Sequence, residues 1–305
     1  MFKKEFKSPN VIMPRMSLAQ FIYTEVLKPR PLRVLTNAIL LRILPRSKRV
    51  GPATIYLDPE DPVLSGAVAL RVYEPSELHF FLQHCRGDMT LVEVGANIGL
   101  YTSLALHNLT QGGRIVAVEP RPQTFAFLEK NIAANRRDGG PRVNAFNIAA
   151  APEAGTRVLF QNPENKADNR VYESNDFKWE TTEVPARPMD DVLAEQGIRE
   201  IHFLKLDVQG YEQMVLRGIK ETLRRSAHVT LMTEFWPKGL KEAGGDAQSY
   251  LAELTELGFK LFELQERPRG KLIPLVDGEA LIRSLKGRKY ANLIGVKGKD
   301  LSFAK

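Results

Sequence analysis

Two carboxylates in the second half of the chain have the residue type and the context for acid–base chemistry. Asp207 ends a predicted strand at 201–207, and Glu234 ends the next predicted core strand, at 228–234. If these two strands are neighbours in the sheet, they lie about 5 Å apart and end at one edge, so both side chains can point into one cleft. Lys205 lies two residues before Asp207 and therefore on the same face, where it can pair with it.

The residue types leave three roles open for this pair. One carboxylate can act as a general base that takes a proton from an acceptor hydroxyl. The two together can hold a divalent cation that orients and acidifies that hydroxyl. Asp207 can instead be structural and contact a cofactor amine or a helix N-terminus. The histidines and the single cysteine show no metal-type clustering, so we predict no resident metal and keep a cation at Asp207 and Glu234 as an alternative.

A strand that turns into a helix through two glycines forms a second candidate site. The apolar residues Leu91, Val92 and Val94 predict a short buried strand, and Gly95 and Gly99 follow it. Glycines allow a sharp turn and a close approach of ligand, while the helix N-terminus offers free N–H groups. A dinucleotide fingerprint starting at Gly95 would need glycine at positions occupied by Asn97 and Leu100. We expect a nucleoside-containing cofactor to bind at Glu93, Gly95, Ala96, Asn97, Gly99, Tyr101 and Thr102.

The next two predicted strands end in residues that suit the rest of a nucleoside. Glu119 lies 24 positions after Gly95, where an acid can accept hydrogen bonds from both ribose hydroxyls. That position serves a nicotinamide dinucleotide and S-adenosylmethionine equally well. Asn147, Ile148 and Ala149 follow the third predicted strand and can flank an adenine, although they can equally be a plain strand end.

The elements that position these residues alternate between strand and helix. Strands are predicted at 91–95, 114–119, 143–148, 201–207, 228–234, 258–265 and 290–296, with helices near 74–84, 98–108, 122–136, 189–196, 210–224 and 246–256. Such alternation predicts an α/β fold, a doubly wound, Rossmann-like, mostly parallel sheet of seven strands. The last two strands lack a crossover helix of ordinary length, which predicts an antiparallel last strand. Shorter β segments are expected at 53–57 and 67–73.

A long connection between the third and fourth core strands is the expected acceptor pocket. It holds predicted strands at 156–161 and 181–187 around a polar loop, residues 162–176. Loops of this length in compact domains are usually functional. We predict that Asn169, Arg170 and Tyr172 bind the acceptor together with Trp236, and solvated loop residues are the alternative. Asn and Arg suit hydroxyl-rich or phosphorylated molecules, and aromatic rings stack on sugar faces.

The positive charge of the chain is concentrated at its start. Residues 1–50 hold 11 Lys and Arg against 2 Asp and Glu, whereas the remaining 255 residues hold 32 against 34. A nearly neutral main domain argues against a nucleic-acid groove, so we predict no nucleic-acid partner. We divide the chain into a basic helical extension (1–50), a β/helical lead-in (51–88) and a catalytic domain (89–298).

Residues 1–50 predict two helices, at 17–28 and 32–44, and two interpretations of them compete. The second, an apolar helix with flanking arginines, can rest on an anionic membrane surface. It can equally be a cap packed on the main domain or a homodimer contact. No apolar run reaches 18 residues, and the start lacks the features of a secretory signal. We expect a cytoplasmic protein, with peripheral contact to the inner face of the membrane as the alternative.

The motifs occur together in an order that resembles one known family, the FkbM-type methyltransferases. They are Tyr73-Glu74 before a helix, Glu93-Val94-Gly95-Ala96-Asn97-Ile98-Gly99, Pro188-Met189-Asp190-Asp191-Val192-Leu193, Lys205-Leu206-Asp207-Val208-Gln209-Gly210, Val215-Leu216-Arg217-Gly218 and Glu234. The resemblance covers about residues 55–296. It implies a class I methyltransferase fold, S-adenosylmethionine as methyl donor, and O-methylation of hydroxyls on sugars, glycans, or glycosylated or polyketide-type metabolites.

One departure from the family pattern concerns the strand-four motif. The family more often has Glu where this chain has Gln209. A neutral amide is neither a base nor an anionic metal ligand, which leaves Asp207 and Glu234 as candidates. Two rivals stay open: a nicotinamide-dependent sugar oxidoreductase, which Asn97 disfavours, and a catalytically silent S-adenosylmethionine-binding scaffold.

Overall fold

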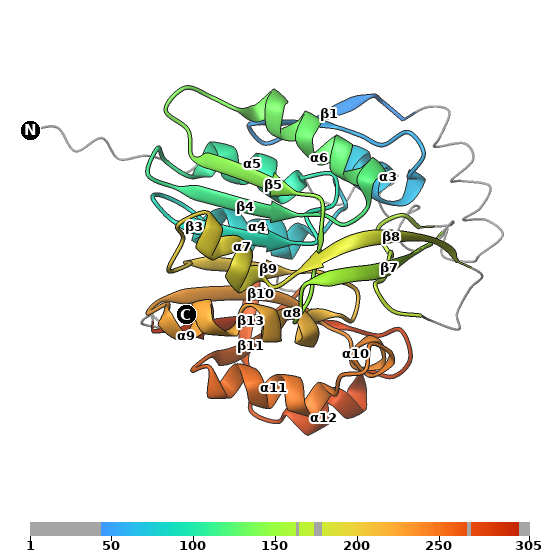
Figure 1. The fold of residues 1–305 in the computed structure, drawn as a ribbon, viewed down its shortest axis with the longest axis vertical. Coiled ribbons are helices and arrows are strands. Elements are labelled where there is room, and N and C mark those ends of the chain that lie inside the picture. Colours follow the sequence, from blue (N-terminus) through green and yellow to red (C-terminus); the bar gives the residue numbers. More distant parts are fainter. Residues whose placement is uncertain (1–43, 163–164, 174–178, 267–269, 299–305) are drawn as a thin grey trace, which may run out of the picture.

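The computed structural model describes residues 44–162, 165–173, 179–266 and 270–298 (Figure 1). Its central sheet has eight strands. In spatial order they are β12 (Lys271–Pro274), β11 (Lys260–Gln265), β13 (Ala291–Lys297), β10 (Val229–Phe235), β9 (Phe203–Leu206), β3 (Thr90–Val94), β4 (Arg114–Val118) and β5 (Arg142–Phe146). The predicted helices at 17–28 and 32–44 lie outside the described residues, apart from position 44.

The direction of the strands confirms the predicted doubly wound architecture. Strands β5, β4, β3, β9 and β10 are parallel, and β13 runs antiparallel between β10 and β11. The expectation of seven strands was one short, because β12 adds an antiparallel hairpin to β11. Strand β12 and the short helix α12 (Gly278–Ser284) lie in the segment between the last two predicted strands, 258–265 and 290–296.

Helices cover both faces of the sheet, which explains why its strands are apolar on both sides. They are α3 (Pro62–Leu70), α4 (Pro75–His84), α5 (Leu100–Asn108), α6 (Pro122–Asn135), α7 (Met189–Glu195), α8 (Glu212–Gly218), α9 (Lys220–Arg225), α10 (Pro237–Glu242), α11 (Ala247–Glu256) and α12. In β9, Phe203 packs with the core formed by α4, α5 and α6, and Leu204 with the core formed by α7, α8 and α11. The two side chains pack in different cores because successive residues of a strand point to opposite faces of the sheet.

Two smaller sheets flank the main one. The hairpin of β1 (Ser47–Val50) and β2 (Ala53–Tyr56) buries Ala53 and Ile55 in the core around α5 and α6. The other sheet joins β6 (Ala149–Ala150), β8 (Glu180–Arg187) and β7 (Gly155–Gln161). It forms the inner part of the long connection, so the β7–β8 loop lies beside the carboxyl ends of the central strands (Figure 1).

The predicted strand at 67–73 is wrong, because most of this segment belongs to helix α3. The Asp61 carboxylate accepts hydrogen bonds from the backbone N–H of Val63 and Leu64, and Pro62 begins the first turn. Aspartate before proline is a favourable helix start, and here it outweighs the β-branched residues that follow. The helix ends at Arg71, whose φ of 60° is left-handed.

The predicted helix at 210–224 is divided into α8 and α9 around Ile219. Gly218 lies against the backbone of Ala151, and a Cβ added there would stand 2.3 Å from the Ala151 carbonyl oxygen. The main chain therefore passes too close to β6 for an ordinary side chain at this point. Among the described residues, no helix is long and apolar enough to cross a bilayer.

Candidate active site

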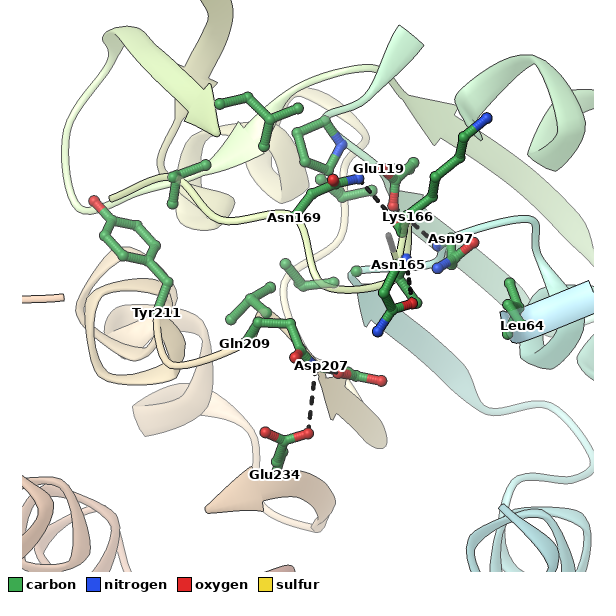
Figure 2. Close-up of a pocket in the computed structure, with 18 of the residues that line it drawn as sticks. Leu64, Asn97, Glu119, Asn165, Lys166, Asn169, Asp207, Gln209, Tyr211 and Glu234 are labelled. Atoms are coloured by element: carbon green, nitrogen blue, oxygen red, sulfur yellow. Dashed lines mark hydrogen bonds between the residues drawn. The ribbon is translucent and has the colours of Figure 1, made fainter. Parts of the chain in front are cut away.

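A cavity of about 310 Å³ opens at the carboxyl ends of β3, β4, β9 and β10. This volume is at the lower end of the range of about 300–1,000 Å³ that is usual for small-molecule sites. Figure 2 shows its lining, with Asn97 and Glu119 on one side and Asp207, Gln209 and Glu234 on the other. The cavity therefore lies where ligands bind in open α/β sheets.

Two elements from outside the central sheet cover this cavity. Helix α3 contributes Leu64 and Ala67, and the β7–β8 loop contributes Asn165 and Asn169. The two covers are joined where the Lys166 ammonium lies 2.7 Å from a carboxylate oxygen of Glu60. This ion pair links the loop to the segment just before α3.

The glycine turn after β3 lies against the chain that leaves β9. The register pairs Val94 with Leu206, so Gly95 stands beside Asp207. A Cβ added to Gly95 would come within 1.9 Å of the Asp207 carbonyl oxygen. Gly95 also has a φ of 84°, a conformation that residues with a side chain rarely adopt. Glycine at this position thus brings the turn and the carboxylate-bearing segment together.

Glu119 is held in place by the turn that it faces. Its Oε2 accepts a hydrogen bond from the Asn97 backbone N–H at 3.0 Å, and its Oε1 accepts one from the Arg121 backbone N–H at 3.0 Å. Burial raises the pKa of Glu119 to about 7, although both hydrogen bonds work against that shift. A carboxylate has about four lone-pair sites, so two remain for a ligand. The geometry suits the two hydroxyls of a ribose.

Replacing Glu119 with alanine is expected to weaken binding of S-adenosylhomocysteine by about 1–3 kcal/mol, roughly 5- to 150-fold in Kd, because hydrogen bonds to a charged group are lost. Isothermal titration calorimetry measures this difference. Glu129→Ala removes an exposed glutamate of helix α6 and is the matched control. An unchanged Kd in Glu119→Ala would remove the ribose-binding role.

The other residues predicted to bind the cofactor divide between the cavity wall and its support. Gly95, Asn97, Glu119, Ala149 and Asp207 line the cavity. The residues that do not line it are Glu93, Ala96, Gly99, Tyr101, Thr102, Asn147 and Ile148. Several of these brace the wall: the Thr102 hydroxyl donates to the buried Glu93 carboxylate, and the Asn147 amide donates to the carbonyl oxygen of Glu119.

Asp207 and Glu234 lie side by side, as expected from neighbouring strands. The register pairs Leu206 with Thr233. Asp207 and Glu234 are the next residues of the two strands, so they are adjacent across the sheet. The Lys205 ammonium lies 3.0 Å from Asp207 Oδ2. Burial disfavours the charged form of Lys205, but the neighbouring carboxylates outweigh this and raise its pKa. Lys205 is therefore a permanent cation beneath Asp207.

Glu234 has a different electrostatic environment from Asp207. Burial raises the pKa of Glu234 well above its ordinary value, and the negative charge of Asp207 raises it further. A carboxyl group that holds its proton more tightly is a stronger base once it is ionised. Of the two predicted catalytic carboxylates, Glu234 is thus better suited to accept a proton.

Glu74 lines the site, although it was not among the predicted site residues. It lines the cavity from the start of α4, and its Oε2 accepts a hydrogen bond of 2.6 Å from the Tyr101 hydroxyl. Its φ of 39° is left-handed. Four described non-glycine residues have a positive φ. Three of them line this cavity, namely Glu74, Asn97 and Gln209. Strained backbone is often concentrated at functional sites. In the sequence, the feature that could have indicated Glu74 was the pair Tyr73-Glu74 ahead of a predicted helix.

Of the four residues predicted to bind the acceptor, Asn169 lines the cavity. Arg170, Tyr172 and Trp236 do not. Arg170 is buried, pairs with Asp168 at 2.8 Å, and lies 4.8 Å from the centre of the Trp236 ring. The Tyr172 hydroxyl donates a hydrogen bond to the Gln209 carbonyl oxygen. These three side chains support the loop from behind.

The described residues contain no group of three or more His, Cys, Asp or Glu side chains arranged to hold a metal ion. Glu74, Asp207 and Glu234 all line the cavity. Lys205 donates to Asp207 Oδ2 and the Gln209 amide donates to Asp207 Oδ1, so one lone pair remains on each oxygen. The ammonium of Lys205 beside Asp207 disfavours a second cation at that carboxylate, and both proton transfer and cation binding stay open as roles of the pair.

Three curated relatives of this chain are methyltransferases. Methyltransferase sdnD of Sordaria araneosa is 30% identical over 197 residues, 53% of this chain and 74% of that protein. The 2-O-methyltransferase NoeI of Sinorhizobium fredii is 26% identical over 219 residues, 65% of this chain and 81% of that protein. The 31-O-demethyl-FK506 methyltransferase FkbM of Streptomyces tacrolimicus is 29% identical over 163 residues, 44% and 60% of the two chains.

Among solved structures, the O-methyltransferase from Bacillus cereus in complex with S-adenosylhomocysteine aligns over 92% of this chain and 96% of that chain, with 13% identity and a TM-score of 0.40. The fold class rests on the strand order of the central sheet. The family model of the methyltransferase FkbM domain matches residues 93–261. Because this match spans more than half of the 305 residues, the chain belongs to the FkbM family of methyltransferases.

Proposed function

We propose that the chain is an S-adenosylmethionine-dependent O-methyltransferase. Its acceptor would be a hydroxyl of a sugar or glycan, or of a glycosylated or polyketide-type metabolite. Two relatives support oxygen as the methylated atom, since their names describe a 2-O-methyltransferase and a 31-O-demethyl-FK506 methyltransferase. The observation that carries the proposal is the shared cavity, in which the turn at Gly95 and the carboxylate of Glu119 face Asp207 and Glu234.

The donor side of the cavity fits S-adenosylmethionine on three counts. Glu119 has lone pairs left for the ribose, and the glycine turn allows close approach of a ligand to the backbone. Val118, Ala149 and Leu159 provide an apolar wall for a purine ring. When bound, S-adenosylmethionine supplies a methyl group that is already activated by its sulfonium.

The acceptor side provides the base that a hydroxyl requires. A sugar hydroxyl is a poor nucleophile at neutral pH, so its proton must leave as the new carbon–oxygen bond forms. Glu234 accepts that proton in our proposal. Asp207, anchored by Lys205, orients the acceptor. The remaining task of the protein is alignment, which brings the acceptor oxygen to about 3–3.5 Å from the methyl carbon.

Methyl incorporation from radiolabelled S-adenosylmethionine into a panel of p-nitrophenyl glycosides and macrolide polyketides tests this proposal directly. We expect transfer to at least one hydroxyl acceptor, located by mass spectrometry, and loss of that transfer in Asp207→Ala. Mass-spectrometric comparison of glycans and glycosylated metabolites from cells with and without the protein identifies the natural acceptor. Calorimetric binding of NAD in place of S-adenosylhomocysteine would contradict the proposal and favour an oxidoreductase. Binding of S-adenosylhomocysteine without transfer to any acceptor would favour a scaffold.

A further inference from the structure

The side-chain amide of Gln209 lies between the two carboxylates of the site. Its Nε2 is 3.1 Å from Asp207 Oδ1 and 3.3 Å from Glu234 Oε2. Figure 2 shows Gln209 beside Asp207, with Glu234 facing the pair. An amide nitrogen carries two N–H donors, so it can serve both acceptors at once. One uncharged group thus links two carboxylates that belong to different strands.

The backbone of Gln209 is held in the conformation that this bridge requires. Its φ is 54°, which is uncommon for a residue with a side chain. The Tyr172 hydroxyl donates to the Gln209 carbonyl oxygen, and the Glu212 carboxylate accepts hydrogen bonds from the N–H groups of Val208 and Gly210. Contacts on both sides of Gln209 therefore stabilise a strained residue, as is typical of positions kept for function.

The charge of the bridging group affects what the carboxylates can do. Lys205 already lies against Asp207 Oδ2. A second cation between Asp207 and Glu234 would favour the ionised form of Glu234 and make it a weaker base. A carboxylate there would add repulsion to a pair of like charges. A neutral amide avoids both effects while it fixes the distance between the two acids.

We propose that Gln209 is a positioning residue, whose amide holds Asp207 and Glu234 together so that Glu234 faces the acceptor hydroxyl. This inference rests on the proposed function, because the acceptor is the molecule that Glu234 would deprotonate. It assigns Gln209 no direct contact with the acceptor. It also assigns a supporting role to Tyr172, whose hydroxyl donates a hydrogen bond to the Gln209 carbonyl oxygen.

The variant Gln209→Gly separates catalysis from folding. Glycine adopts a positive φ without strain, so the unfolding midpoint should be equal to or higher than that of the wild type. Affinity for S-adenosylhomocysteine should be unchanged, and kcat for a p-nitrophenyl glycoside acceptor should fall by about 10- to 100-fold through loss of alignment. Gln209→Asn keeps an amide and tolerates the left-handed region, so it should retain more activity than Gln209→Gly. Wild-type kcat in Gln209→Gly would overturn the proposal.

A cation titration tests the bridge without any acceptor. In Gln209→Glu, three carboxylate oxygens would meet where the amide now lies, and carboxylates are the preferred ligands of Mn²⁺. We expect the full-length variant to bind Mn²⁺ roughly tenfold more tightly than the wild type in calorimetry. Equal affinity would show that residue 209 does not lie between Asp207 and Glu234. A wild-type chain that methylates no hydroxyl contradicts the proposed function, whereas this titration still decides on the bridge.

Discussion

Replacing Glu234 with glutamine should lower kcat for methyl transfer by about 100- to 10,000-fold, the usual contribution of a general base. Glutamine has nearly the same shape and can still accept the hydrogen bond from the Gln209 amide, but it cannot take a proton. Binding of S-adenosylhomocysteine should not change, because Glu119 and the Gly95 turn form the donor side. Steady-state kinetics with a p-nitrophenyl glycoside, together with calorimetry, separate the two effects.

The same substitution should stabilise the fold at neutral and alkaline pH. The folded-state pKa of Glu234 is raised by burial and by Asp207 above the ordinary value of 4.5. Well below that value, both the folded and the unfolded chains are protonated, and the ionisation of Glu234 has no effect on stability. As the pH rises toward the raised pKa, the unfolded chain loses its proton first, so the wild-type stability falls. Glu234→Gln should therefore gain stability relative to the wild type across this window.

The matched control is Glu256→Gln, which changes an exposed glutamate near the end of α11. Its kcat and its unfolding midpoint should follow the wild type at every pH. Wild-type turnover in Glu234→Gln would transfer the role of base to Asp207 or Glu74. A stability difference that does not change between pH 5 and pH 8 would show that Glu234 is not destabilised by ionisation.

The donor side of the site could be predicted from sequence because its signals are local. A turn that must have positive φ selects glycine at position 95, and the acid at Glu119 follows a strand end where a ribose would be expected to bind. Each feature is recognised from the few residues around it. Asp207 and Glu234 needed one further assumption, the order of two neighbouring strands, and the structure has that order.

The acceptor side was harder to predict because its residues come together through packing. Nothing in the residue type of Arg170 distinguishes a side chain that faces a ligand from one buried against Trp236 and Asp168. Glu74 reaches the cavity from the start of α4, which precedes the first strand of the central sheet in the chain. It is too far in sequence from Asp207 and Glu234 for a periodic pattern to link it to them. Helix α3 was missed for a different reason, since the start at Asp61-Pro62 outweighed the strand propensity of the following residues.

Gly95→Ala is the substitution for which we expect the largest loss of stability, about 2–5 kcal/mol in the free energy of unfolding. Part of this loss, about 1–2 kcal/mol, comes from an alanine at φ 84°. The rest, about 1–3 kcal/mol, comes from forcing the Asp207 backbone away from a Cβ that would stand 1.9 Å from its carbonyl oxygen. Because the displaced residue carries one of the two carboxylates, donor binding and kcat should fall together. Denaturant unfolding and calorimetry measure these changes.

Gly244→Ala isolates the contribution of the close contact. Gly244 has a φ of 80°, close to that of Gly95, but a Cβ added there meets no atom within 4 Å. It should therefore show the backbone strain alone, with donor affinity and turnover unchanged. The difference between the two variants then measures how tightly the glycine turn is packed against Asp207. Equal losses in both variants would mean that the turn can move away from β9, and that donor and acceptor sides of the cavity are not rigidly joined at this point.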